Sequence, residues 1–330
     1  MRQIDDTSLP QQAFKRQEAV RVGNVTVVAQ HDKVSFDQYK RQLLAQSYRI
    51  HETEHFVICQ KPSSHHTILI HSFGQSEINA DLIRFIEEEL PAFRVIESEK
   101  AFGATLFAIL ASTFSAPRDQ PTIWRRFCLN TLEALRDGIA HPYRTLSPTS
   151  YIGPFSAIYL RIFELFTGQS LLDAGCSFGF LPVLMAERYP HARITGCDNN
   201  PDAITFSNDL ANVTNANGLT FTLLDVLSED FPRQESVDTV TAIHLLEHLT
   251  EQDLPAALTH LLQVTNKRLI IAVPYEEEAQ GLYGHHQVFT PEKLNYWGNW
   301  CIEQLKGEGR YWCEEVMGGM LIIERSAGEK

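Results

Sequence analysis

The sequence predicts an α/β protein, with a doubly wound parallel sheet that ends in an antiparallel C-terminal hairpin and a separate N-terminal α+β module before it. Residues 171–180 (LLDAGCSFGF) have the pattern of a buried strand followed by a loop of small residues. Residues 194–200 (ITGCDNN) indicate a second strand closed by an acid, and the spacing leaves room for one helix between two parallel strands. The tail, YWCEEV followed by MGGMLIIER, indicates the hairpin.

Three further strand patterns complete the predicted sheet. They are TFTLL at 220–224, VDTVTAI at 237–243 and RLIIAV at 268–273. Thr290 and Pro291 then predict a helix start, because threonine caps a helix and proline fits its first position. Since ligands of such sheets bind at the carboxyl ends of the strands, the residues that follow each strand are the candidate site.

The small-residue loop excludes the common nucleotide folds. A dinucleotide loop needs glycine at its first, third and sixth places, which here are Gly175, Ser177 and Phe180. The bulky Phe180 stands where the helix must lie close to the strand, so NAD and FAD are disfavoured. A phosphate-binding Walker loop is also disfavoured, because no Gly-Lys-Ser/Thr follows.

The loop instead resembles the acid-x-Gly-x-Gly-x-Gly loop of class I S-adenosylmethionine-dependent methyltransferases, with Ser177 in place of the middle glycine. The resemblance covers about residues 155–325 and implies a Rossmann-like seven-stranded sheet with S-adenosyl-L-methionine as cofactor. That cofactor carries no phosphate, so the loop needs small residues for close approach rather than an anion cradle. Asp198 is placed to accept hydrogen bonds from both ribose hydroxyls, and the resemblance implies that Asp225 and its neighbour contact adenine. The predicted cofactor-binding residues are Asp173, Gly175, Cys176, Ser177, Gly179, Asp198, Asn199, Asp225, Val226 and His244.

Histidines after the fourth and fifth strands are the candidate catalytic residues. His244 and His248 lie four apart where VDTVTAI ends, and His285 and His286 lie in the loop PYEEEAQGLYGHHQVFT. Related methyltransferases often line the acceptor pocket with this loop. A histidine there could remove the proton of an acceptor hydroxyl, since its ordinary pKa is near neutral. His285, His286 and His248 are therefore predicted to be catalytic, with packing of the loop as the alternative role.

The motif His51-Glu52-Thr53-Glu54-His55 matches the zinc-protease pattern His-Glu-x-x-His, which binds metal only on a helix. The apolar run at 56–59 follows at once and indicates a strand, so we interpret the motif as a turn and predict no metal site. His65, His66 and His71 are interpreted as loop residues. The three glutamates at 276–278 are interpreted as a solvated face.

Composition limits the partners and the compartment. The formal net charge is −13, and no cluster of Lys/Arg with interleaved aromatics stands out, so nucleic acid and anionic membranes are disfavoured. No run of about 18 apolar residues predicts a membrane span, and the N-terminus lacks an apolar secretory core. The six cysteines have no paired metal spacing, and a cytoplasmic location follows as the simplest expectation.

The sequence predicts four segments. They are a flexible N-terminus (1–18), an accessory α+β and helical module (19–140), a linker rich in Pro and Gly (141–154) and the methyltransferase domain (155–330). The accessory module is expected to cap the cofactor edge, to shape the acceptor pocket or to pair subunits in a homodimer.

The expected activity is O-methylation of a small metabolite or of a sugar or oligosaccharide hydroxyl. The Asn/Asp-Pro-Pro-Tyr/Phe motif of amide and adenine N-methylation is replaced by His244-Leu-Leu-Glu247. The strings FGFLPVLMAER, TVTAIHLLEHL and WRRFCLNTLEAL also resemble the mycofactocin oligosaccharide methyltransferases, which implies a glucose hydroxyl as acceptor. The alternatives are a cofactor-binding protein and an enzyme of this fold with non-methylating chemistry.

Overall fold

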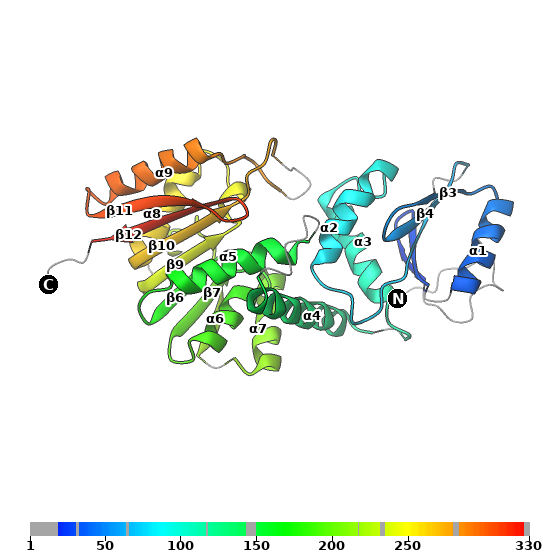
Figure 1. The fold of residues 1–330 in the computed structure, drawn as a ribbon, viewed down its shortest axis with the longest axis horizontal. Coiled ribbons are helices and arrows are strands. Elements are labelled where there is room, and N and C mark those ends of the chain that lie inside the picture. The colour runs from blue at the N-terminus through cyan, green and yellow to red at the C-terminus, as the bar shows by residue number, and fades with distance from the viewer. Residues whose placement is uncertain are drawn as a thin grey trace. The chain divides into compact units, whose positions relative to one another are not determined.

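The computed structural model describes residues 19–30, 33–63, 66–116, 118–142, 150–216, 218–231, 235–279 and 284–326 (Figure 1). The chain divides into two compact units, Met1–Asn130 and Thr131–Lys330. The division falls inside helix α4 (Gln120–Ala140). The predicted flexible segment 1–18 and the middle of the predicted linker, 143–149, lie outside the described residues. The last three residues of that linker belong to helix α5 (Ile152–Leu165).

The N-terminal unit is built on a five-stranded sheet in the order β1-β2-β5-β4-β3. β2 and β5 are parallel and the other neighbours are antiparallel. β2 and β5 are buried along almost their whole length, because Tyr39 and Leu43 of α1 pack against the sheet and α3 contacts β1 and β2. The elements are β1 (Val20–Val22), β2 (Val25–Ala29), α1 (Lys33–Ala45), β3 (Arg49–Glu52), β4 (Phe56–Lys61), β5 (His66–His71), α2 (Asp81–Glu89), a 3₁₀ turn η1 (Pro91–Phe93) and α3 (Glu99–Ser112).

The C-terminal unit contains a seven-stranded sheet in the order β11-β12-β10-β9-β6-β7-β8. The strands from β10 to β8 run parallel, while β12 runs antiparallel to both of its neighbours. This confirms the predicted doubly wound sheet with its C-terminal hairpin. The strands are β6 (Ser170–Ala174), β7 (Arg193–Asp198), β8 (Leu219–Leu223), β9 (Val237–Ile243), β10 (Thr265–Val273), β11 (Gly309–Glu315) and β12 (Gly319–Arg325).

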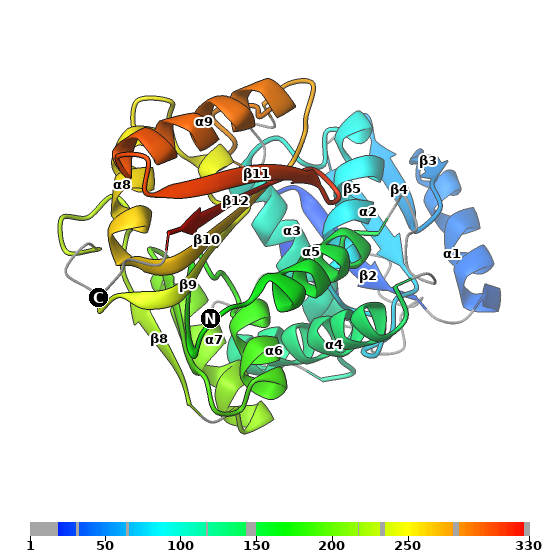
Figure 2. The same ribbon diagram turned by 60° about the vertical axis from the view of Figure 1, so that its left-hand side comes forward.

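Helices cover both faces of this sheet, with α8 and α9 on one side and α5 and α6 on the other (Figure 2). The central strands β6, β9 and β10 are buried almost throughout, which explains their nearly continuous apolar sequences. Leucines of α8 and Trp297 of α9 belong to the core beneath the sheet. The remaining elements are α6 (Phe180–Arg188), α7 (Pro201–Thr214), a 3₁₀ turn η3 (Leu246–His248), α8 (Leu254–Val264) and α9 (Pro291–Gln304).

The order of the strands in the sheet indicates where a ligand would bind. β6 lies at the centre of the parallel strands, with β7 and β8 added on one side and β9 and β10 on the other, so the strand order reverses at β6. Ligands of open α/β sheets bind at the carboxyl ends of the strands next to such a switch point. The loops after β6, β7, β8, β9 and β10 therefore meet at one edge. Among the described residues, no helix combines the length and the apolarity needed to cross a membrane.

Thr290 caps α9 as predicted, with its hydroxyl accepting from the main-chain N–H of Lys293 at 3.2 Å. Replacing Thr290 by alanine should lower the free energy of unfolding by about 1 kcal/mol, because one N–H of the first turn loses its acceptor. Urea unfolding of Thr290→Ala measures this. Thr205→Ala is the matched control, since the exposed Thr205 hydroxyl only donates to a carbonyl of its own helix and its loss should be nearly neutral. Equal losses in both variants would contradict the capping role.

Candidate functional site

The loop between β6 and α6 is a tight left-handed turn tied to the end of β7. The N–H groups of Gly175 and Cys176 both donate to the carbonyl of Cys197, at 2.8 and 2.9 Å, and the N–H of Gly179 donates to Cys176 at 2.8 Å. Gly175, Ser177 and Gly179 all have positive φ, at 74°, 48° and 78°. The glycines take this conformation without strain, whereas Ser177 bears the cost that a side chain brings.

Gly179 is required for a second reason. A Cβ there would lie 2.6 Å from the ring of Phe221 and 3.0 Å from Ser207. The start of α6 therefore packs directly on β8 and α7, and the Ser207 hydroxyl donates to the carbonyl of Ser177 at 2.8 Å. This hydrogen bond ties the loop to α7, in addition to its bonds to Cys197 at the end of β7.

Asp198 joins the loops that follow β6 and β7. One carboxylate oxygen accepts from the N–H of Ser177 at 2.9 Å and the other accepts from the N–H of Asn200 at 2.9 Å. Each oxygen retains a further lone pair, so the carboxylate can still accept two hydroxyl groups. Asn200 in turn caps α7 with its side chain.

Asp173 is buried between two strands of the sheet rather than exposed to the loop. Its carboxylate accepts from the Thr241 hydroxyl of β9 at 2.7 Å. Burial raises the pKa of Asp173 to about 7, the Thr241 hydrogen bond opposes the rise and the charge of Asp198 adds to it. Asp173 thus connects β6 to β9 directly below the loop.

The residues predicted after β8 lie at the same edge. Asp225 accepts from the N–H of Leu227 at 2.8 Å, and the Asn199 amide is 3.4 Å from its other oxygen. Val226 is buried, and its carbonyl accepts from the ring of His260 at 2.7 Å. The structure therefore brings the predicted cofactor residues of β6, β7 and β8 together around one loop.

The turn after β9 is polar and partly buried. His244 has φ of 51°, and its Nδ1 lies 3.2 Å from a carboxylate oxygen of Glu247. Glu247 has no exposed surface, and neither of its carboxylate oxygens has a hydrogen-bond partner among the described residues. His244 Nε2 is also buried without a described partner. Burial lowers the pKa of His248, and the charge of Glu247 opposes that shift.

The loop before α9 is fastened onto this turn. The N–H of His286 donates to the carbonyl of Glu247 at 2.8 Å. The Gln287 amide donates to the carbonyls of Leu246 at 3.0 Å and Leu249 at 2.7 Å. These bonds bring His285 against His248, with ring centroids 4.8 Å apart, while the side chain of His286 is exposed. His285 Nδ1 lies 2.8 Å from a carboxylate oxygen of Glu276.

Two sets of residues at this edge were not anticipated. Glu276 contacts His285 and so is not part of a solvated face, unlike the exposed Glu277 and Glu278. The aromatic rings of α5 line the same edge: Phe155 lies 4.9 Å from the ring of His244, and Tyr151 and Tyr159 pack on Phe155. The spacing of four between the three aromatics was the available signal.

The zinc-protease motif does not lie on a helix. His51 and Glu52 lie in β3, which corrects the predicted turn, and His55 lies beyond it. The ring of His55 stacks on Phe85, with centroids 3.7 Å apart, and its Nδ1 lies 2.5 Å from Glu89.

The neighbouring histidines also have structural partners. His66 and His71 belong to β5 rather than to a loop, and they hydrogen-bond to Thr26 and Ser112 at 3.0 and 2.8 Å. His65 lies outside the described residues.

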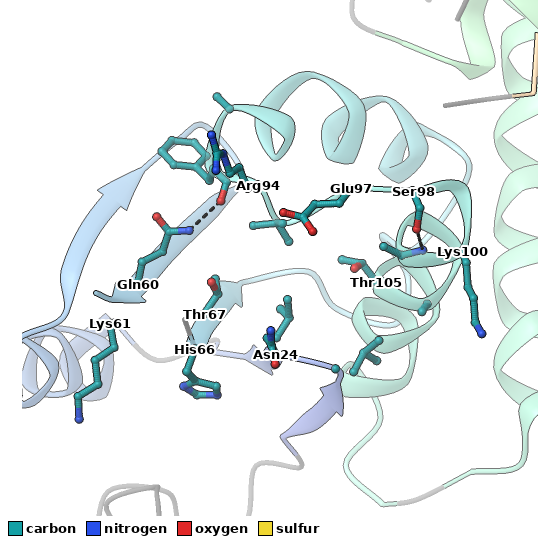
Figure 3. A pocket seen from close by; sticks show the side chains of 18 of the residues that line it. Asn24, Gln60, Lys61, His66, Thr67, Arg94, Glu97, Ser98, Lys100 and Thr105 are labelled. Carbon is teal, nitrogen blue, oxygen red and sulfur yellow. Dashed lines mark hydrogen bonds between the residues drawn. The ribbon is translucent and has the colours of Figure 1, made fainter. Parts of the chain in front are cut away.

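The N-terminal unit contains a cavity of about 890 Å³ between β1, β4, β5, η1 and the start of α3 (Figure 3). The Gln60 amide donates to the carbonyl of Phe93 at 2.7 Å across one of its walls. Its charged lining is mostly cationic, which contrasts with the acidic chain. The charged residues are Arg49, Lys61, Arg94, Lys100 and Glu97.

The central part of the C-terminal unit is similar to known methyltransferases. Residues 171–268 match the family model described as a methyltransferase domain. N-methyltransferase 4 of Papaver somniferum is 26% identical over 82 residues, which cover 25% of this chain and 23% of that protein. Pavine N-methyltransferase of Thalictrum flavum subsp. glaucum is 28% identical over 97 residues, or 29% and 27% of the two chains. The chain thus spans about a quarter of the length of these curated relatives.

A solved structure covers more of the chain. Magnesium protoporphyrin IX methyltransferase from Synechocystis PCC 6803 with bound SAH aligns with a TM-score of 0.39 and 16% identity. The alignment covers 64% of this chain and 90% of that one.

The raised pKa of Asp173 predicts an unusual pH dependence. A carboxyl whose pKa rises on folding stabilises the fold fully below its ordinary pKa of 3.8, and this contribution is lost as the pH approaches 7. We therefore compare the free energy of unfolding of the wild type with that of Asp173→Asn. The wild-type value minus the variant value should fall by on the order of a few kcal/mol between pH 4 and pH 7, and should stay level above pH 7. Urea unfolding without cofactor at several pH values measures the difference.

Glu324→Gln is the control for that measurement. A hydrogen bond from Arg268 lowers the pKa of Glu324, so its contribution is complete above its ordinary pKa of 4.5 and is lost only in acid. The corresponding difference should be constant from pH 6 to pH 8. If the difference in unfolding free energy between the wild type and Asp173→Asn also stayed constant between pH 4 and pH 7, the raised pKa of Asp173 would be refuted.

Proposed function

We propose that this chain transfers the methyl group of S-adenosyl-L-methionine to an oxygen of a small metabolite or of a sugar or oligosaccharide hydroxyl. Its residues 171–268 belong to the class I S-adenosylmethionine-dependent methyltransferases, and S-adenosyl-L-methionine is the cofactor. The observation that carries the proposal is the convergence of two kinds of residue at one edge of the sheet. A small-residue loop faces the end of β7, and histidines follow β9 and β10.

The loop fits a nucleoside cofactor without a phosphate. Gly175 and Gly179 let the loop pack closely on its neighbours, because a Cβ on Gly175 would lie 3.0 Å from Leu245 and one on Gly179 would lie 2.6 Å from Phe221. We assign the ribose hydroxyls to Asp198, because its carboxylate is anchored by two N–H groups and still has lone pairs. Asn199, Asp225 and Val226 are assigned to the adenine side. Asp173, Cys176, Ser177 and His244 are assigned to the remaining wall.

When bound, the cofactor supplies an electrophilic methyl group on a sulfonium, whose leaving group is a neutral thioether. The protein then has mainly to position the acceptor, and good alignment can supply about 7–11 kcal/mol of the barrier. The acceptor pocket is assigned to the edge between β9 and β10. There His248 and His285 are placed to hold or remove the hydroxyl proton, and the exposed His286 lies next to them.

The N-terminal unit is proposed as an accessory module that shapes the acceptor pocket or pairs subunits. Its cationic cavity supports a binding role, because four lysine and arginine side chains line it beside a single acid. We also propose a cytoplasmic location, since all six cysteines are free thiols and five of them are buried. The mycofactocin oligosaccharide acceptor remains a prediction from the sequence.

Asp198→Ala should weaken binding of S-adenosyl-L-methionine by about 1–3 kcal/mol, or roughly 5- to 150-fold in Kd, because the ribose hydroxyls lose their acceptor. Isothermal titration calorimetry measures the change. Asp202→Ala is the matched control, since it removes the same charge from the exposed first turn of α7 and should leave the Kd within about twofold. Unchanged affinity in Asp198→Ala would refute the assignment.

The activity itself is tested with isotope-labelled S-adenosyl-L-methionine and an extract of host metabolites. We expect mass spectrometry to find the label in a hydroxyl-bearing product and S-adenosylhomocysteine formed in equal amount. Tight cofactor binding without S-adenosylhomocysteine in any extract would instead favour the alternative, a cofactor-binding protein or an enzyme with non-methylating chemistry. Label on nitrogen would refute the O-methylation proposal while preserving methyl transfer.

A further inference from the structure

A fully buried carboxylate lies at the turn after β9 and lacks a hydrogen-bond partner among the described residues. Glu247 has an exposed fraction of 0%, and neither of its carboxylate oxygens accepts a hydrogen bond from the described residues, although His244 Nδ1 lies 3.2 Å from one of them. An ionised carboxylate removed from water costs several kcal/mol unless a cation or hydrogen bonds compensate it. A bound cation would compensate this side chain.

Two imidazoles approach the same carboxylate. One ligand atom each of Glu247, His248 and His285 lies within 4.8 Å of the other two. Ligand atoms about 2.1 Å from a shared ion lie about 3.4 Å apart in a tetrahedral site, so these atoms would have to approach one another by up to about 1.4 Å to complete the coordination. We expect rotation of the exposed His248 and the partly exposed His285 to supply this approach.

From this arrangement we propose that Glu247, His248 and His285 bind a divalent transition-metal ion. A carboxylate with two imidazoles suits Zn²⁺, Mn²⁺ or Co²⁺ better than Mg²⁺ or Ca²⁺, which take oxygen ligands. Three protein ligands leave coordination positions open, as in catalytic rather than structural sites.

The surroundings hold two of these ligands in place. His285 is hydrogen-bonded to the Glu276 carboxylate at 2.8 Å, the kind of outer partner that orients metal-binding histidines. The main-chain bond from His286 to the carbonyl of Glu247 fastens the loop that carries His285 onto the turn that carries the carboxylate.

A simpler arrangement would pair Glu247 with a protonated His244. His244 Nδ1 is 3.2 Å from the carboxylate, but the pair forms no hydrogen bond, and the other carboxylate oxygen is left unpaired. The pair also gives no reason for His248 and His285 to converge on the same point. If Glu247 is paired only with His244, metal ions should not bind, so a metal titration distinguishes this pairing from the proposed metal site.

This inference rests on the proposed function and adds to it the chemical class of the acceptor. An ion with open positions binds acceptors that carry two neighbouring oxygens, such as the vicinal hydroxyls of a sugar, and lowers the pKa of the bound hydroxyl. With His248 and His285 bound to the ion, the ion replaces them as the group that activates the hydroxyl. The hydroxyl proton passes to solvent and the oxygen forms a bond to the methyl carbon. The carbon–sulfur bond breaks with its electron pair remaining on sulfur, so the sulfonium becomes a neutral thioether.

The test is titration of the full-length, metal-free protein with Co²⁺, followed by visible absorption, and calorimetry with Zn²⁺, Mn²⁺ and Mg²⁺. We expect one Co²⁺ per chain, with absorption bands of an ion bound by nitrogen and oxygen, and weaker binding of Mg²⁺. Absence of saturable Co²⁺ binding would overturn the proposal.

Three variants locate the ion. Glu247→Gln should weaken Co²⁺ binding by more than about 100-fold, and Glu276→Gln by about 10- to 100-fold, because one removes a ligand and the other an outer partner. His191→Ala removes an exposed histidine between α6 and β7 and should leave the affinity unchanged. Circular dichroism of each variant checks folding. Unchanged binding in a folded Glu247→Gln would place the ion elsewhere and overturn the proposal.

Activity separates this inference from the function on which it rests. Loss of methyl transfer on removal of the metal, with restoration by Mn²⁺ or Co²⁺ and unchanged binding of S-adenosyl-L-methionine, would support both. Full methyl transfer by the metal-free enzyme would overturn the role of the ion while the proposed function stands. Metal binding at Glu247 without methyl transfer to any acceptor would support the site and contradict the proposed function.

Discussion

The left-handed turn between β6 and α6 is the constraint on which the rest of the site depends. Two N–H groups of this turn share the carbonyl of Cys197, and a third is held by the carboxylate of Asp198. The turn is possible because Gly175 and Gly179 accept positive φ, and because Gly179 lets Phe221 pack where a side chain would otherwise lie. The loops of three strands thereby share one fixed geometry.

The same edge divides into two chemically different halves. Toward β7 and β8 the lining consists of small residues and acids. Such a lining suits the ribose and adenine of a nucleoside and disfavours an anion. Toward β9 and β10 it consists of histidines, Glu247 and Glu276 under the aromatic rings of α5. β6 separates the halves, and Asp173 links it to β9 through Thr241. Cofactor and acceptor would therefore meet over β6, the central strand of the parallel sheet.

The sequence was sufficient for the parallel sheet because its central strands, β6, β9 and β10, are buried almost throughout and have nearly continuous apolar patterns. β9, for example, has the predicted limits, Val237–Ile243. The cap at Thr290 was likewise local and therefore predictable. The environment of Glu247 was not, because its burial depends on the loop at 284–287, which is fastened to the turn by main-chain and amide bonds. Glu276 was misinterpreted for the same reason, since its partner lies nine residues later in that loop.

The central claim is that S-adenosyl-L-methionine binds against the β6–α6 turn, with its ribose on Asp198. The most direct measurement is a crystal structure of the full chain with S-adenosylhomocysteine. We expect both ribose hydroxyls within hydrogen-bonding distance of the Asp198 carboxylate and the adenine beside Asp225 and Val226. Density for the ligand at another place, or a ribose turned away from Asp198 in a fully occupied site, would contradict the account.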